Sequence, residues 1–264
     1  MKALIKIGGT LLDSAESRAR LAAEIAQAVA NGLRAVVVHG GGKQMTRYLA
    51  ERGVETRFVN GLRVTTPEVL DAVLKVFAGS VNQELVAAFV ACGARAVGLT
   101  GMDALLTEAR RMSDELGSVG KPAQSDARLL DLLIENGYLP VVACVAGDRQ
   151  GRFYNVNADQ MAASIAAAVR ADKLVFLTDV EGVRGRDNVI HSTITPAESR
   201  FLIDNGIATG GMQAKLEAAA EALYLGVGEI TIAPGAVDGV ISLVLSSNQA
   251  GTKLIAEVEV ADHG

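Results

Sequence analysis

Short, continuously apolar segments alternate with helical patterns along almost the whole chain, and this alternation is the strongest constraint on the fold. Apolar runs of this length are typical of strands covered on both faces, and they occur at 3–7, 35–38, 94–99, 139–145, 173–177 and 229–232. Helical patterns lie between them, at 13–31, 43–52, 67–78, 81–91, 125–136, 159–169, 196–205 and 212–225. Residues 100–123 are less regular and predict a hairpin or a covering loop. The alternation predicts an α/β fold, a three-layer αβα sandwich with a mainly parallel central sheet.

The length and charge of the chain narrow the class of protein. With 264 residues it can form one large domain or two lobes that share a sheet. Half of the residues are hydrophobic and 21% are charged, which is typical of a globular protein. The formal net charge of −5 argues against a general nucleic-acid binder. The glycine-rich stretch 147–151 is the best candidate boundary, which predicts an N-terminal lobe of residues 1–150 and a C-terminal lobe of residues 151–264, joined by one continuous sheet.

The cysteines and the N-terminus predict the cellular compartment. Cys92 and Cys144 form no C-x-x-C pair, so buried free thiols in a reducing compartment are expected, with neither a disulfide nor a zinc site. Met1 and Lys2 lead directly into the first strand, which leaves no room for a signal peptide. No uninterrupted apolar run approaches the roughly 18 residues of a membrane span. The expectation is a cytoplasmic protein that binds neither membranes nor nucleic acid.

The first strand carries one charge, Lys6, and is followed at once by Gly8 and Gly9. A lysine beside backbone amides that no side chain shields is suited to binding an anion. The alternative is a buried strand whose lysine extends to the surface before an ordinary turn. Residues 3–9 alone leave both interpretations open.

A second glycine loop, His39 to Gly42, lies between a strand and a helix. Three successive glycines let backbone amides and the helix N-terminus face a carboxylate or a phosphate. The loop matches neither the G-x-x-x-x-G-K-[ST] nor the G-x-G-x-x-G pattern, and a plain tight connection is the alternative. His39 is a tempting base, although a histidine at a strand end more often packs or bonds locally.

Four further segments carry polar groups next to predicted elements. Arg63 follows a turn and has the donor geometry to bind a carboxylate, although an ordinary surface arginine is the alternative. The run 155–159 places three short polar residues before a helix; one is expected to be the N-cap, and Asp159 could orient a nearby lysine. Lys215 lies near the start of a helix, against the helix dipole, which indicates an anionic partner. The loop 178–182 follows a buried strand, as a nucleotide-contacting loop would.

These candidates point to a reaction class. The sequence has no cluster of histidine and cysteine with metal-ligand spacing and no G-x-S-x-G motif. Two lysines, an arginine and an aspartate, spread among glycines, suit phosphoryl transfer, because positioning and charge neutralisation do most of that work.

The motifs also occur in a characteristic order. They are K-I-G-G at Lys6, H-G-G-G at His39, N-G-L-R-V-T at Asn60, N-V-N-A-D at Asn155, T-D-V-E-G at Thr178 and G-G-M-x-x-K at Gly210. Together they resemble the amino acid kinase family, from Met1 to about Ile255. The motifs at Asn60 and Asn155 are the most specific, and they resemble the members that phosphorylate N-acetylglutamate in arginine biosynthesis.

The resemblance implies a carbamate kinase-like fold in which the N-terminal lobe binds N-acetyl-L-glutamate and the C-terminal lobe binds ATP. It implies a homodimer, and Mg²⁺ that is carried by ATP and not held by a metal site of the protein. The residues implied in catalysis are Lys6, Lys215 and Asp159. Those implied in binding the acceptor are Gly41, Gly42, Arg63 and Asn155. Those implied at the nucleotide are Gly8, Gly9, Asp179, Val180, Glu181, Gly182, Val183, Arg184, Ile207, Ala208 and Thr209.

The implied chemistry agrees with the residues present. The acceptor carboxylate, with a pKa of about 4.3, is already ionised at neutral pH, so no general base is needed. Positive charge is needed, to offset two anions as they approach. Two alternatives stay open: a kinase of the same fold for a carrier-protein-linked aminoadipate or glutamate, and an inactive binding or regulatory homologue. Relatives that arginine inhibits resemble one another in an extra N-terminal helix, and because Lys6 comes so early here, an arginine-insensitive enzyme is expected.

Overall fold

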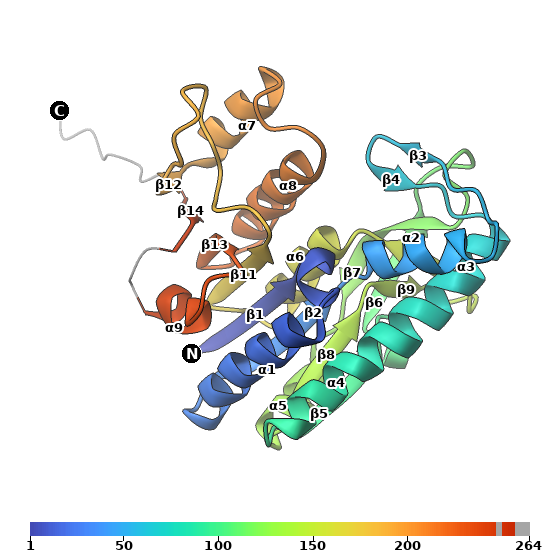
Figure 1. The fold of residues 1–264 in the computed structure, drawn as a ribbon, viewed down its shortest axis with the longest axis horizontal. Coiled ribbons are helices and arrows are strands. Elements are labelled where there is room, and N and C mark those ends of the chain that lie inside the picture. The colour runs from blue at the N-terminus through green and yellow to red at the C-terminus, as the bar shows by residue number, and fades with distance from the viewer. Residues whose placement is uncertain (247–249, 257–264) are drawn as a thin grey trace.

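The computed structural model, which describes residues 1–246 and 250–256, is built around one eight-stranded sheet (Figure 1). The strand order is β12-β14-β13-β11-β1-β2-β8-β5. The strands are β1 (Lys2–Ile7), β2 (Arg34–His39), β5 (Ala96–Thr100), β8 (Leu139–Ala143), β11 (Lys173–Thr178), β12 (Thr193–Ile194), β13 (Glu229–Pro234) and β14 (Thr252–Leu254). Neighbouring strands are parallel except for β13 and β14. The predicted α/β class and mainly parallel sheet are confirmed.

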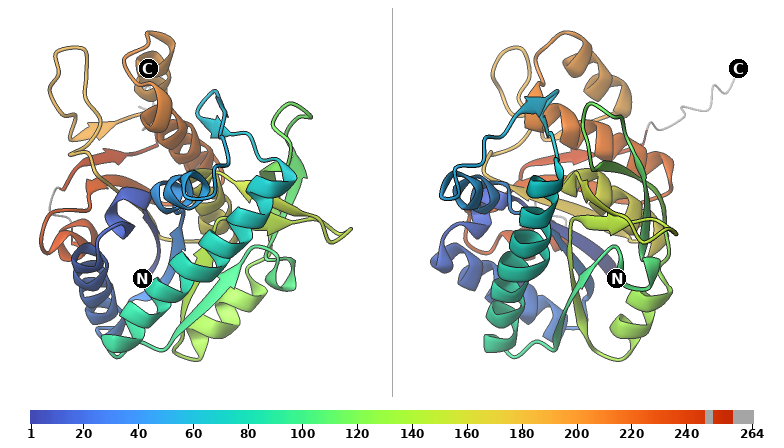
Figure 2. Two further views of the ribbon diagram at one scale, coloured as in Figure 1. Left: turned by 45° about the vertical axis from the view of Figure 1, so that its right-hand side comes forward. Right: turned by 90° about the vertical axis from the view of Figure 1, so that its right-hand side faces the viewer.

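Helices cover both faces of this sheet. On one face α1 (Ala15–Ala30) packs against both α4 (Asn82–Ala91) and α9 (Val240–Leu245). The other face carries α5 (Arg128–Glu135), α6 (Ala158–Ala168) and α8 (Gly210–Tyr224). The Lys2 ammonium ties this second layer to β1, since it donates to Asp131 of α5 and to the carbonyl that follows α6. The right-hand view of Figure 2 shows α4 and α5 on opposite sides of the strands.

The strand that carries Lys6 is the centre of the core. β1 pairs with β2 on one side and with β11 on the other. Ala3, Leu4, Ile5 and Ile7 are fully buried, and Lys6 is 6% exposed. A charge on so rigid and buried a strand is held in place by its neighbours and needs a partner of opposite charge.

Two smaller sheets lie beside the main one. A closed four-stranded barrel is formed by β6 (Thr107–Arg111), β7 (Val119–Ser125), β9 (Val145–Gly147) and β10 (Phe153–Val156), and its antiparallel β6–β7 pair confirms the predicted hairpin. A two-stranded hairpin is formed by β3 (Phe58–Val59) and β4 (Leu62–Arg63). Asn60 and Gly61 turn it with φ values of 49° and 77°, which suits the asparagine-glycine pair of a tight hairpin. The remaining helices are α2 (Gly42–Ala50), α3 (Pro67–Val73) and α7 (Pro196–Asp204).

Several local predictions are wrong. The two helices predicted at 67–78 and 81–91 form one run, because α3 continues through a π-helical segment, Leu74–Val81, into α4. The capping-box spacing of Asp13 and Glu16 predicts Asp13 as the cap of α1, but Ser14 caps it: its hydroxyl accepts from the Ser17 N–H at 3.0 Å. The strand predicted at 139–145 ends at Ala143 and resumes in the small barrel. Cys144 is buried as expected, but Cys92 is exposed, and both are free thiols.

One helical run, Pro67–Ala91, is long and apolar enough to cross a membrane, by length and composition only. Its most apolar window has a mean hydropathy of 1.3 and is 39% buried. Charged and polar residues interrupt it, so the sequence shows no continuous apolar stretch. Its buried side packs on α1 and on strands β5 and β8, as a core helix does.

Candidate active site

Two glycine loops meet at the carboxyl ends of the central strands. β1 and β2 end in register, with Ile7 opposite His39, so the residues that follow each strand are neighbours. A Cβ added to Gly9 would lie 3.2 Å from the backbone nitrogen of Gly42, and one on Gly8 would lie 2.9 Å from the carbonyl of Leu177. Only residues without side chains let these backbones approach so closely. The site is therefore floored by backbone, in which the Gly8 N–H already donates to the Leu177 carbonyl at 2.9 Å.

A carboxylate joins two lysines behind this floor. Asp159 lies 2.7 Å from the Lys6 ammonium through one oxygen and 3.2 Å from the Lys215 ammonium through the other. The three side chains are 7%, 7% and 14% exposed for Asp159, Lys6 and Lys215. They come from the first turn of α6, the central strand β1 and helix α8. The structure thus brings together the three residues that the resemblance implies in catalysis, with the aspartate between the two lysines.

The α6 start that presents Asp159 is fixed by its cap. The Asn157 side chain accepts from the N–H groups of Asp159 at 2.8 Å and of Gln160 at 3.2 Å. This satisfies two N–H groups that the helix itself leaves free. One of the three polar residues before the helix is thus the N-cap, as the sequence predicts.

Burial and charge shift the protonation equilibria of this triad. Burial acts to raise the pKa of Asp159, but Lys6 and Lys215 act against it, and the net direction is below the ordinary value. Burial lowers the pKa of Lys215, and the nearby Lys6 lowers it further, while Asp159 opposes both. With one anion for two cations, the triad holds an excess of positive charge next to the glycine loops.

An open cleft of about 700 Å³ extends from this triad. Seven of the residues expected at the site line it: Lys6, Gly8, Gly9, Gly42, Arg63, Asp179 and Lys215. The sequence reasoning missed several others, among them Thr10, Asp13, Lys43, Thr46, Arg47 and Phe58. Their only available signal is their place just after the two glycine loops or on the hairpin before Arg63. With five lysines and arginines and two aspartates along its wall, the cleft is built for an anion.

Arg63 is held at the rim of this cleft by helix α2 and the β3–β4 hairpin. Its guanidinium donates to the Thr46 hydroxyl at 2.8 Å and stacks 4.6 Å from the centre of the Phe58 ring. Burial lowers its pKa from the ordinary value. Its Nη1 is buried with no hydrogen-bond partner among the described residues. Such a donor fits a bound carboxylate, which is the role the sequence suggested.

Other predicted residues do not line this cleft. The Asn155 amide donates to the Thr65 hydroxyl at 3.0 Å, beneath the β3–β4 region. Gly41 is buried against Phe77. The residues Val180 to Arg184 and Ile207 to Thr209 are also absent from its wall. Among them Val183 is fully buried, and its N–H donates to the Thr252 hydroxyl at 2.8 Å, so it acts as core.

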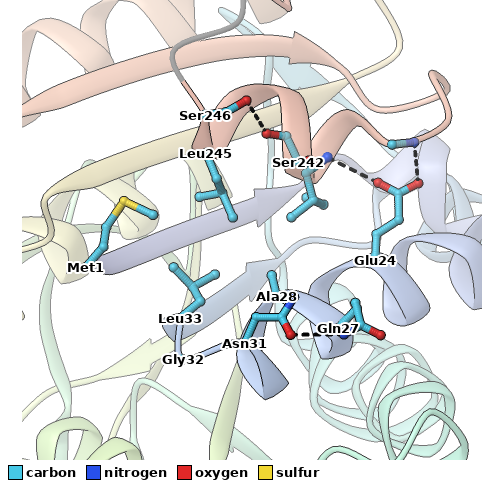
Figure 3. A pocket seen from close by; sticks show the side chains of 12 residues that line it. Met1, Glu24, Gln27, Ala28, Asn31, Gly32, Leu33, Ser242, Leu245 and Ser246 are labelled. Atoms are coloured by element: carbon cyan, nitrogen blue, oxygen red, sulfur yellow. Dashed lines mark hydrogen bonds between the residues drawn. The ribbon is translucent and has the colours of Figure 1, made fainter.

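A second cavity, of about 610 Å³, lies between α1 and α9, beside Met1 (Figure 3). It sits at the start of β1, the end of the sheet opposite the triad. Its carboxylate, Glu24, already accepts from the N–H groups of Gly239 at 3.0 Å and Ile241 at 3.1 Å. Ligands of such sheets bind beyond the carboxyl ends of the strands, so the chemistry belongs to the cleft at Lys6.

The fold, and the two lysines beside its glycine loops, are typical of an α/β phosphotransferase. A family model described as "Amino acid kinase family" matches residues 1–234. The chain belongs to the amino acid kinase family.

Individual relatives refine this assignment. The chain is 60% identical over 255 residues to the acetylglutamate kinase of Solibacter usitatus (strain Ellin6076), covering 97% of this chain and 99% of that one. It superposes with a TM-score of 0.86 on N-acetylglutamate synthase from Neisseria gonorrhoeae complexed with coenzyme A and N-acetyl-glutamate. That match has 27% identity and spans 97% of this chain but 60% of the synthase. Carbamate kinase from Giardia lamblia bound to AMP-PNP shares the fold, at 17% identity, a TM-score of 0.71, and 97% and 98% coverage.

Proposed function

We propose that this kinase transfers the γ-phosphoryl group of ATP to the side-chain carboxylate of N-acetyl-L-glutamate, forming N-acetyl-L-glutamyl 5-phosphate for arginine biosynthesis. The observation that carries the proposal is the Lys6–Asp159–Lys215 triad at the end of two glycine loops. The relative at 60% identity is an acetylglutamate kinase, which supports the choice of acceptor.

In this proposal the protein supplies charge and position, and the acceptor supplies the nucleophile. One carboxylate oxygen of the acceptor attacks the γ-phosphorus, and the bond to the β-phosphate oxygen breaks in line with it. Lys6 and Lys215 offset the charge of the transferring group, and Asp159 holds both ammonium groups in place. No proton has to be removed, because the attacking carboxylate is already ionised.

The acceptor lies on the α2 side of the cleft. Arg63 pairs with its α-carboxylate through the side of the guanidinium that lines the cleft. Gly41 and Gly42 present their N–H groups at the start of α2, which favours negative charge. Asn155 contributes from the adjoining barrel.

The nucleotide lies on the side of β11 and α8. Gly8 and Gly9 face its phosphates, the loop Asp179 to Arg184 and the turn Ile207 to Thr209 surround the rest, and the Lys215 ammonium reaches the γ-phosphate. Mg²⁺ arrives with ATP and neutralises phosphate charge. Asp13 is paired with Arg47 at 3.0 Å, which leaves Asp179 as the carboxylate of the cleft that could face the ion.

The same proposal covers the organisation of the chain. Residues 1–150 form the acceptor lobe and residues 151–264 the ATP lobe, over one sheet. A homodimer is supported by the half-buried apolar helix Pro67–Ala91, where Val90 is 56% exposed, next to the edge strand β5. The free thiols suit a reducing cytoplasm.

Acceptor-dependent ADP release tests the proposal directly. The purified enzyme with Mg²⁺-ATP is given N-acetyl-L-glutamate, glutamate or carbamate, and hydroxylamine traps any acyl phosphate. Release and trapping only with N-acetyl-L-glutamate are expected. Release with another acceptor would assign a different carboxylate or carbamate kinase. No release with any of the three would favour a binding protein on this fold.

A further inference from the structure

The strand that ends in the second glycine loop also carries a fully buried histidine with two fixed partners. His39 is 0% exposed. Its Nδ1 lies 2.8 Å from the Gly40 carbonyl, and its Nε2 lies 2.9 Å from the side-chain nitrogen of Asn82 at the start of α4. Asn82 is itself 1% exposed, and the same nitrogen lies 2.9 Å from the Val141 carbonyl on β8.

These contacts assign the tautomer of the ring. The Asn82 atom that faces the Val141 carbonyl has to be a donor, so it is the amide nitrogen, and it donates its second hydrogen to His39 Nε2. Nε2 then accepts, and the proton of the neutral ring sits on Nδ1, from which it donates to the Gly40 carbonyl. Burial lowers the pKa of His39 to about 4, although the bond to Gly40 acts against this, so the ring stays neutral at neutral pH.

The bond to Gly40 fixes the peptide that enters the loop. In a planar trans peptide the carbonyl and the following N–H point in opposite directions. A Gly40 carbonyl held toward His39 therefore turns the N–H of Gly41 away from the ring. This N–H has no acceptor among the described residues, and it belongs to the residue that precedes α2, beside the backbone of Gly9.

The π-helical segment Leu74–Val81 presses on the same loop. A Cβ on Gly41 would lie 2.9 Å from the Phe77 ring and 3.2 Å from a Val81 methyl, so these side chains cover the glycine directly. The i→i+5 bonding of a π-helix places residues i+4 and i+5 under residue i. Phe77, Val81 and Asn82 therefore face the loop together, two of them on Gly41 and one on His39.

We propose that His39 and Asn82 are positioning residues, which fix the Gly40–Gly41 peptide so that the N–H of the buried Gly41 is turned toward its neighbours Gly9 and Gly42, which line the cleft, and so toward the anion transferred or attacked there. Phe77 and Val81 hold the same peptide from above. The inference rests on the proposed function for the identity of that anion, but the tautomer and the fixed peptide do not depend on it.

¹⁵N NMR tests the hydrogen bonds of His39 without an activity measurement. The chain has three histidines, so a ¹⁵N-histidine spectrum is simple enough to assign with His39→Asn. At neutral pH His39 is expected as the neutral tautomer protonated at Nδ1, unchanged when Mg²⁺-ATP is added. A ring protonated at Nε2, or at both nitrogens, would overturn the proposal.

A matched pair of variants tests the consequence. The amide nitrogen of His39→Asn takes the place of Nδ1 and keeps the donation to the Gly40 carbonyl, whereas the amide oxygen of His39→Gln takes the place of Nε2, accepts from Asn82 and leaves the Gly40 carbonyl without this donor. A purely structural histidine would make both variants lose activity in proportion to their lost stability. If the orientation of the Gly40–Gly41 peptide determines the rate, His39→Asn should keep kcat within about threefold of the wild type. His39→Gln should lower kcat at least about tenfold, with the KM for ATP little changed.

Equal kcat values for the two variants, or a larger loss in His39→Asn, would refute the positioning role. Thermal unfolding of both variants separates this result from misfolding. If the wild-type protein releases no ADP with any acceptor, the proposed function is refuted. The tautomer of His39 would then still decide whether the Gly40–Gly41 peptide is fixed as described.

Discussion

Replacing Asp159 by asparagine removes the one negative charge between the two lysines and keeps the shape of the side chain. At 2.7 Å and 3.2 Å, the Coulomb attraction of each pair is about 5–6 kcal/mol at an effective dielectric constant of about 20. Part of this loss is offset, because the carboxylate no longer has to be desolvated and the neighbouring groups can relax. Breaking a buried pair typically costs about 3–5 kcal/mol. We expect Asp159→Asn to lower the free energy of unfolding by that amount and kcat by about 100-fold or more, since both ammonium groups lose their anchor.

Bound ATP should restore part of the lost stability, because its phosphates supply negative charge to the same two lysines. The shift in melting temperature on adding Mg²⁺-ATP is therefore expected to be larger for Asp159→Asn than for the wild type. The stability difference between the two proteins should also depend on pH. Because the folded pKa of Asp159 is below its ordinary value of 3.8, its contribution is complete above that pH and disappears as pH falls through the folded pKa.

The chain offers a matched control in Glu229. This carboxylate also joins two lysines, Lys173 at 2.9 Å and Lys253 at 3.4 Å, but at the opposite end of the sheet. Glu229→Gln should lower stability and leave kcat and the response to ATP unchanged. The reasoning is refuted if Asp159→Asn keeps kcat within about threefold of the wild type, or if ATP stabilises the two variants equally.

Three further changes probe the cleft. Arg63→Lys removes the forked donors and should raise the acceptor KM about tenfold with kcat little affected; steady-state kinetics with an unchanged KM would exclude Arg63 from the acceptor site. Burial lowers the pKa of Lys215, so kcat/KM should begin to fall at a pH below 10.5, the pKa of an ordinary lysine. Lys215→Arg should move this decline to higher pH. If the pH profiles of kcat/KM coincide for the two proteins, Lys215 does not have the proposed role. Gly41→Ala places a methyl group within 2.9 Å of the Phe77 ring and should lower stability by about 1–3 kcal/mol. In thermal unfolding, the double variant Gly41→Ala with Phe77→Leu should recover part of this loss. If it recovers none, a contact other than Phe77 causes the loss.

The members of the Lys6–Asp159–Lys215 triad could be singled out from the sequence because each of them violates a local rule. Lys6 is a charge in a buried strand, Asp159 is one polar residue more than a helix cap needs, and Lys215 opposes a helix dipole. In a parallel sheet such violations gather at the carboxyl ends of the strands. Their meeting within 2.7 Å and 3.2 Å follows from topology, once the element order is read correctly.

Other parts of the site could not be predicted, because they depend on long-range packing. Asn82 lies 43 residues from His39 in the chain, and in the polar run Asn82-Gln83-Glu84 it reads as an ordinary surface residue. Lys43 and Arg47 read as ordinary charges on an exposed helix, and only the position of α2 over the cleft gives them meaning. Val183 lies in a loop with a nucleotide-contacting pattern, yet tertiary contact with Thr252 makes it core.

The π-helical segment Leu74–Val81 makes the length of its helix as important as its composition. One wide turn holds Phe77 and Val81 over Gly41 and delivers Asn82 to His39. Removing a single residue from this segment would let the helix relax to regular α geometry, and the side chains beyond it would keep their direction, because the wide turn had absorbed the extra residue. Phe77, Val81 and Asn82 could then no longer face the loop together. A one-residue deletion inside the segment would therefore leave the rest of the helix in place and still release the loop from it.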